Sequence, residues 1–195
     1  MSRLKRLTAA ERTPAQQALF ERITASRGAA HRDQPLADEE GRLAGPFNAM
    51  LYAPKIGEAA QELGARLRFH SSLPGRLREA AILTVAQSWR AGYEWCAHAP
   101  IARREGVAQS DIEAIGRGEP PTGDPDLALV HRFVSRLLED RRVDAETYQA
   151  AVALLGEAGV VELVMITGYY CLISATLNSF EIAPPSGCEP PFDAG

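Results

Sequence analysis

Proline and glycine residues divide this sequence into segments that have the apolar spacing of helices and lack the alternation of strands. Helices are predicted over residues 14–26, 46–52, 55–69, 76–90, 93–105, 110–116, 126–139, 144–155 and 160–180. No segment alternates apolar and polar residues between turn dipeptides, as a half-buried strand does. An all-α fold is therefore predicted.

The loops between these segments predict that the chain is divided into three parts: an N-terminal part, a helical domain and a tail. Residues 1–45 are expected to hold an N-terminal helix, stopped at Gly28, and a polar arm. Residues 46–185 are expected to form one helical domain, and 186–195 a tail. The last helix is apolar nearly all round, which predicts burial on several sides. In a chain this small, such a helix indicates a subunit interface.

Composition excludes several classes of protein. The 195 residues are 46% hydrophobic and carry a net charge of −4, so a core is expected and a nucleic-acid binder is not. The first twelve residues lack the apolar region of a secretory signal. The apolar stretch 163–177 is shorter than the ~20 residues that span a bilayer. A cytoplasmic protein without a membrane partner is expected.

The cysteines show no framework. Cys96, Cys171 and Cys188 are odd in number and irregularly spaced, so neither a disulfide scaffold nor a zinc ribbon is expected. No Cys-x-x-Cys occurs, so a dithiol site of that type is not expected. The other histidines, His31, His70 and His131, lack a second ligand at metal spacing. No metal or organic cofactor is implied.

Two helices carry charge on apolar faces. Glu79 precedes Ile82 and Leu83 by three and four positions and shares their face. A carboxylate there is costly unless it is paired, although a first-turn position near the helix dipole, partly in solvent, is the alternative. Glu94 and His98 are four residues apart among apolar neighbours. They form either a general acid/base pair or an ordinary surface pair.

The runs REAAILTVA (78–86), YEWCAH (93–98) and IARREGV (101–107) resemble the carboxymuconolactone decarboxylase family. The last helix, with Gly168-Tyr169-Tyr170 and Asn178, looks like the closing helix of that family. That family includes the AhpD group of alkylhydroperoxidases. The resemblance covers about residues 46–184. It implies an AhpD-like helical domain that assembles into an oligomeric helical bundle, a homo-oligomer such as a trimer or hexamer.

The resemblance also assigns roles to residues. In the hydroperoxidase branch, a Glu precedes a Cys-x-x-Cys whose second cysteine is followed four residues later by His. The Glu falls on Glu79 and the His on His98, while Ala91 and Glu94 occupy the two cysteine positions. The thiol cycle of that branch is therefore not expected. Glu79, Glu94 and His98 are instead expected to meet in one pocket.

The expected activity is acid/base chemistry, without a cofactor, on a small carboxylated or lactone substrate, as in a decarboxylase (carbon–carbon lyase). His98 is the expected proton donor or acceptor, Glu94 orients it, and Glu79 relays or holds a proton. Additional candidates for binding the substrate are Arg90, Trp95, Cys96 and Phe47. Two alternatives stay open: a peroxide-handling oxidoreductase that uses Cys96 with a partner thiol, and a non-catalytic helical oligomer.

Overall fold

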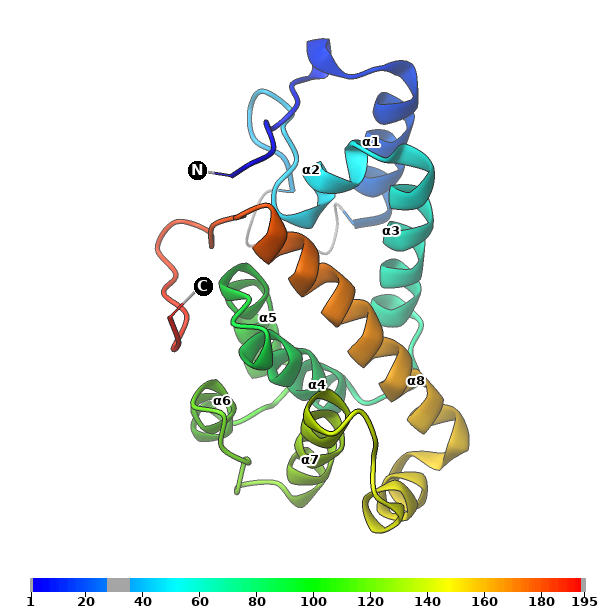
Figure 1. Ribbon diagram of the computed structural model, residues 1–195, viewed down its shortest axis with the longest axis vertical. Helices are drawn as coiled ribbons and strands as arrows, with labels where there is room; N and C mark the ends of the chain where they lie inside the picture. Colours follow the sequence, from blue (N-terminus) through cyan, green and yellow to red (C-terminus); the bar gives the residue numbers. More distant parts are fainter. Residues whose placement is uncertain (1, 28–35, 194–195) are drawn as a thin grey trace. The chain divides into compact units, whose positions relative to one another are not determined.

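The structure, a computed structural model, describes residues 2–27 and 36–193, which form two compact units (Figure 1). The first unit is Met1–His70 with Ser179–Ala183, and the second is Ser71–Asn178 with Pro184–Gly195. The domain ranges 1–45, 46–185 and 186–195 stay a prediction. The predicted helix stop at Gly28, part of the predicted arm and His31 lie outside the described residues.

The predicted all-α class is confirmed, and the helices follow the predicted ranges closely. They are the 3-10 helix η1 (Ala9–Glu11) and the α-helices α1 (Pro14–Arg27), α2 (Pro46–Leu51), α3 (Pro54–Phe69), α4 (Gly75–Ser88), α5 (Gly92–Arg104), α6 (Gln109–Gly116), α7 (Pro125–Glu139) and α8 (Ala145–Ser179). Four of them begin at a proline, which suits the first helical position because no backbone N–H is needed there. No strand occurs in the described ranges, where the only β-type pairing is an isolated bridge between Ala37 and Leu43.

In the first unit, α1, α2 and α3 pack against one another. The buried Asn48 side chain of α2 accepts from the backbone N–H of Leu7 and donates to the carbonyl of Lys5. These two bonds fasten the N-terminal segment to the helices. Gly57 of α3 lies so close to α2 that a Cβ there would stand 2.4 Å from the carbonyl oxygen of Met50. The lack of a side chain at that position lets the two helices meet.

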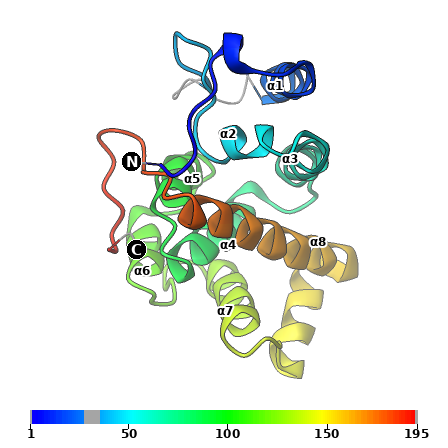
Figure 2. The ribbon, with the colours of Figure 1, turned by 45° about the horizontal axis from the view of Figure 1, so that its top comes forward.

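Helix α4 is the centre of the second unit, where it contacts α5, α6 and α7 (Figure 2). Every residue from 79 to 86 is buried, Glu79 included. A helix covered on all sides leaves no face on which a charged side chain can reach solvent. The carboxylate of Glu79 must therefore find its partners inside the protein.

Helix α8 contains the last two predicted helices, which meet at a break. Gly156 has φ 70° and ψ 168°, a conformation that glycine adopts without the steric cost of a side chain. After this break, α8 passes beside α4 and α5 (Figures 1 and 2). Glu162 accepts from the Ser71 hydroxyl at 2.6 Å, and the Asn178 amide donates to the carbonyl of Trp89 at 2.7 Å. Both ends of this part of the helix are thus anchored.

By length and hydropathy alone, α8 meets the criterion for a membrane-spanning helix. A core helix of a soluble protein meets the same criterion. Several of its residues are fully buried, among them Leu163, Ile166 and Leu177. The face of α8 that carries these residues packs inside the second unit. Burial in the core therefore accounts for part of the apolar composition of the helix.

The expectation that the cysteines form no disulfide is wrong for one pair. Cys96 of α5 is bonded to Cys188 of the C-terminal segment, 92 residues later. Beside it, the ring of Phe192 packs edge-on against Trp95, with ring centroids 5.6 Å apart. Cys171 is the free cysteine of the chain. An odd count excludes pairing of all three cysteines but not pairing of two, and a bond across 92 residues has no spacing signature.

Loss of this disulfide is predicted to destabilise the protein by about 2–4 kcal/mol, because the open chain gains conformational entropy when it unfolds. Urea unfolding of the C96S/C188S double variant measures the change, and reductant should move the wild-type midpoint in the same direction. C171S, which removes a cysteine but no bond, is the matched control. Equal midpoints for the wild type with and without reductant would contradict a stabilising bond.

Candidate functional site

His98 lies between two carboxylates in the interior of the second unit. Its Nδ1 is 2.6 Å from Oε2 of Glu79, and its Nε2 is 3.1 Å from Oε1 of Glu94. Glu79 is 0%, His98 3% and Glu94 4% exposed. The three residues expected to meet do so, and every distance is within hydrogen-bonding reach. Their catalytic role stays a prediction.

Local structure explains how these groups come together. Glu79 lies in the second turn of α4, whereas Glu94 is in the first turn of α5 and His98 one turn later. The short turn after α4 contains Arg90 with φ 51°, and it lets α5 pack directly against α4. Glu94 also benefits from its place near the positive end of the α5 dipole.

The charges of this cluster favour a protonated histidine. Burial alone would lower the pKa of His98, but the charge and hydrogen bond of Glu79, followed by those of Glu94, outweigh burial and raise the pKa. When the ring is an imidazolium, both N–H groups donate, one to each carboxylate. Each of the two carboxylates then accepts a hydrogen bond from one N–H group of the ring.

A fourth charge stands beside Glu79. Nε of Arg78, the preceding residue, lies 3.5 Å from Oε1 of Glu79, and both side chains are largely buried. With His98 protonated, two cations face two carboxylates, so the cluster has no net charge. That balance reduces the cost of burying four ionisable groups in one place. Sequence reasoning missed Arg78 because adjacent residues on a helix do not normally share a face.

Aromatic rings from α8 flank the cluster. The ring of Tyr170 stands edge-on to His98 with centroids 5.2 Å apart, and Tyr169 stands edge-on to Tyr170 at 5.4 Å. Both tyrosines are buried. They limit the movement of the imidazole and keep water from that side. In the sequence, the Tyr-Tyr pair belongs to the resemblance of the last helix to the family's closing helix, and its position against His98 depends on the packing of α8.

The four additional candidates lie in different settings. Arg90 is exposed in the turn between α4 and α5. Trp95 is buried against Phe192, and Cys96 is bonded to Cys188, so contacts with the C-terminal segment occupy both side chains. Phe47 is buried on α2 in the first unit. None of these contacts indicates a role in substrate binding, which stays a prediction for all four.

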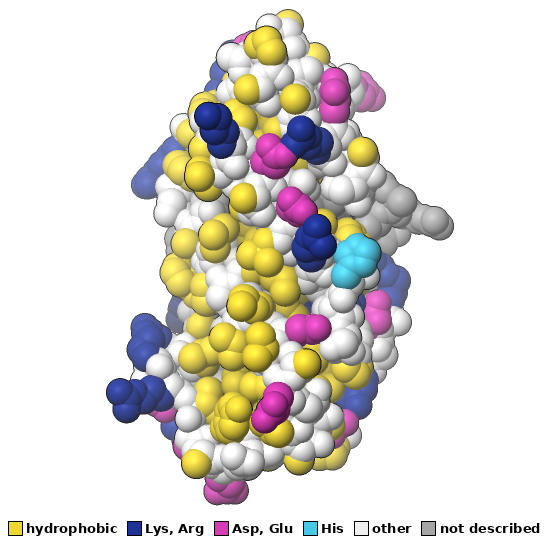
Figure 3. Space-filling model, turned by 90° about the vertical axis from the view of Figure 1, so that its right-hand side faces the viewer, with side chains coloured by type: hydrophobic (Ala, Val, Ile, Leu, Met, Phe, Trp, Pro, Cys, Tyr) yellow, Lys and Arg dark blue, Asp and Glu magenta, His cyan; other side chains and the backbone are white. Residues whose placement is uncertain are grey.

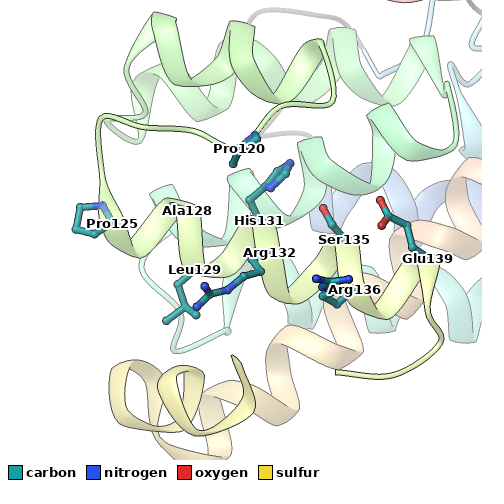
Figure 4. A pocket seen from close by; sticks show the side chains of 9 residues that line it. All are labelled: Pro120, Pro125, Ala128, Leu129, His131, Arg132, Ser135, Arg136 and Glu139. Carbon is teal, nitrogen blue, oxygen red and sulfur yellow. The ribbon is translucent and has the colours of Figure 1, made fainter. Parts of the chain in front are cut away.

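The second unit also has a hollow along α7, with a volume of about 520 Å³ (Figure 4). His131, Ser135 and Glu139 point to one side of the helix, and Leu129 and Arg132 to the other. Burial lowers the pKa of His131, so its ring is neutral at pH 7. Apart from Pro120, every lining residue comes from α7, and these side chains do not converge on a common point.

No group of three or more histidine, cysteine, aspartate or glutamate side chains is arranged to hold a metal ion within the part of the chain that the structure describes. The cluster around His98 joins one imidazole to two carboxylates, each of which can carry a proton. In chemical terms, such a set can hold, give and take protons.

Residues 54–131 match the sequence model of the carboxymuconolactone decarboxylase family, which confirms the resemblance over that part of the chain. The matched range begins with α3 and extends into α7, so it includes Glu79, Glu94 and His98. A comparison with curated protein sequences found no match.

Two solved structures have the same helical fold. One is an uncharacterized peroxidase-related protein from Silicibacter sp. TM1040, with a TM-score of 0.71 and 13% identity over 95% of this chain and 92% of that one. The other is the debrominase Bmp8, with a TM-score of 0.65 and 13% identity over 93% of this chain and 91% of that one. The AhpD-like helical fold is therefore confirmed.

The raised pKa of His98 predicts how stability depends on pH. The folded protein holds this proton more tightly than the unfolded chain, so the stabilisation is complete below the ordinary pKa of 6.5 and is lost as pH rises through the folded value. E79Q removes the nearest negative charge and should shift this loss to lower pH. Urea unfolding across the pH range measures both profiles.

The control for this prediction is E62Q, which alters an exposed ion pair with Arg66 on α3. Its profile should follow that of the wild type. Superimposable pH profiles for the wild type and E79Q would contradict the link between Glu79 and the protonation of His98.

Proposed function

We propose that this protein is an acid/base enzyme that acts on a small carboxylated or lactone substrate, with chemistry of the decarboxylase (carbon–carbon lyase) type. The observation that carries the proposal is the buried imidazole held between the carboxylates of Glu79 and Glu94. The family match over residues 54–131 supports it, since this range contains all three residues.

His98 is the proposed proton donor. The Nε2–Glu94 contact is the longer of its two contacts, 3.1 Å against 2.6 Å, so the substrate is proposed to enter on the Nε2 side. In a decarboxylation, the bond to the carboxylate breaks, carbon dioxide leaves, and the electron pair stays on the carbon. The Nε2 proton of the imidazolium then moves to that carbon, and water later restores it.

The two carboxylates have different proposed roles. Glu79 keeps the ring oriented through Nδ1 and stabilises its positive charge, as a positioning residue. Glu94 accepts the hydrogen bond from Nε2–H before the substrate enters and again after water has returned the proton to the ring. Burial supports these roles. Both carboxylates are shielded from water, so their attraction to the positively charged ring of His98 is stronger than it would be at the surface.

H98N is predicted to lower turnover by about 10²–10⁴-fold, the usual contribution of a positioned acid or base. Carbon dioxide release from 4-carboxymuconolactone and a panel of related carboxylated lactones provides the assay. E62Q, which changes an exposed side chain of α3 outside the cluster, is the control and should keep turnover. Full turnover by a folded H98N variant would overturn the proposal.

A second candidate function, peroxide reduction, is favoured by one observation: Cys96, expected to need a partner thiol, has one in Cys188. Reduced Cys96 would attack the peroxide, the O–O bond would break, and an alcohol or water would leave, with Cys96 converted to a sulfenic acid. Cys188 would then displace water to form the observed bond, and an external dithiol would reduce it again. The peroxidase-related structure shares only the fold.

The two candidates respond oppositely to the same variants. Peroxide consumption in the presence of a dithiol requires both cysteines, so C96S/C188S would abolish it. Lactone turnover requires His98 and does not require the cysteines. The proposed cytoplasmic location suits either candidate, because a reducing compartment would return the disulfide to the dithiol that peroxide reduction needs.

We also propose that the protein forms a homo-oligomer, with no nucleic-acid or membrane partner. Val161, Val164, Met165 and Leu172 form an exposed apolar stripe along α8. Hydrophobic side chains also gather on the surface that Figure 3 shows. Exposed patches of this kind are typical of interfaces.

V161E/M165E is predicted to dissociate the oligomer, because these two side chains are the most exposed members of the stripe, at 56% and 54%. Light scattering after size exclusion gives the mass of the wild type and the variant. V161T/M165Q, which adds polarity without charge, is the milder comparison. A wild-type mass equal to that of one chain would contradict the proposal.

A further inference from the structure

A second hollow in the second unit, of about 660 Å³, lies where three helices meet. Ser88 and Trp89 line it at the end of α4, Leu137 and Leu138 at the end of α7, and residues 164–171 in the middle of α8. Its volume is within the range of small-molecule sites. None of its lining residues belongs to the cluster around His98.

The walls of this hollow are mainly apolar, and they include the indole of Trp89. A flat indole and the branched side chains of Leu137, Leu138 and Val164 suit an aromatic or branched hydrocarbon group. The Thr167 hydroxyl is already used, since it donates to the carbonyl of Leu163 within α8. Besides the Ser88 hydroxyl, the side chains of the walls offer little hydrogen-bonding capacity for a polar ligand such as a sugar.

One positive charge stands at this apolar hollow. Arg141 is the only charged residue among those that line it, and it forms no ion pair with any residue that the structure describes. Its backbone has φ 61°, a left-handed conformation that costs free energy for a residue with a side chain. The residue is exposed at the hollow, and a guanidinium can bind a carboxylate through two parallel hydrogen bonds.

Cys171 shows that these groups converge. Burial raises the pKa of the Cys171 thiol, while a hydrogen bond from Trp89 and the positive charge of Arg141 act in the opposite direction. The side chains of Trp89 and Arg141 therefore both lie close enough to Cys171 to influence its sulfur. The thiol stays protonated at neutral pH, so it is a wall of the hollow and a poor nucleophile.

Gly168 keeps the hollow open. A Cβ at this position would meet no atom within 4 Å, although the residue is in the middle of α8. Glycine weakens a helix relative to most residues, and no neighbouring group requires it here. A larger side chain at 168 would project into the hollow without displacing the surrounding protein.

We propose that this hollow binds an organic monocarboxylate with an aromatic or branched apolar body, with the carboxylate on Arg141 and the body against Trp89. This site is separate from the proposed acid/base site, and it does not depend on the activity of that site. The apolar stripe of α8 borders the hollow at Val164. A second copy of the chain that fills the hollow is the rival occupant.

The test uses Cys171 as a reporter, because it is the free cysteine and labels without interference from the disulfide. The rate of its reaction with a small maleimide is measured with 1-naphthoate as the probe and with uncharged 1-naphthylmethanol as the matched compound. Naphthoate should slow labelling in a saturable manner. The alcohol should bind about tenfold more weakly, because it lacks the charge-assisted bonds to Arg141.

Two variants make the test specific. R141Q should weaken the binding of naphthoate by about tenfold and leave the binding of the alcohol unchanged. G168L should abolish protection by both compounds, while its unfolding midpoint stays at or above that of the wild type. A153L, at an exposed position of α8 before the Gly156 break and outside both the hollow and the apolar stripe, is the matched control and should behave as the wild type does.

Three results would overturn the proposal. The first is unprotected labelling of Cys171 at the solubility limit of naphthoate, and the second is equal protection in the wild type and G168L. The third is labelling that slows with protein concentration in the absence of any probe, which would assign the hollow to a second copy. Loss of lactone turnover in H98N has no bearing on these outcomes, so failure of one proposal is distinguishable from failure of the other.

Discussion

The second unit depends on how a buried carboxylate is neutralised. Glu79 lies on a helix that has no solvent face, so its charge must be matched by groups from the same helix and its neighbours. Arg78 and His98 supply the match, and His98 in turn requires Glu94. The packing of α4 against α5 and the protonation of His98 therefore stabilise each other, since neither is favourable without the other.

The helices and the main site residues could be predicted because local rules govern both. Proline at the first turn and glycine at the breaks mark helix ends, and Gly156 interrupts α8 where two separate helices were predicted. The pair Glu94 and His98 follows from a spacing of four, and Glu79 from its place on an apolar stripe. The resemblance to a family then linked two helices that spacing alone could not connect.

The contacts that were missed depend on tertiary packing. Tyr170 flanks His98 only because α8 passes beside α5, and the bond between Cys96 and Cys188 joins residues 92 positions apart. Arg78 reaches Glu79 from the adjacent position, which helix geometry normally disfavours. The role of Glu94 is clearer in three dimensions. It occupies one of the cysteine positions of the hydroperoxidase branch, and its carboxylate contacts Nε2 of His98.

The central claim is that His98 is held as an imidazolium between two carboxylates. Nuclear magnetic resonance of the protein labelled with ¹⁵N-histidine tests it directly, with the His98 signals assigned by their loss in H98N. The account predicts that the titration midpoint lies above the ordinary 6.5, because Glu79 and Glu94 outweigh burial, and that both ring nitrogens carry protons below that midpoint. A midpoint at or below 6.5 would contradict it.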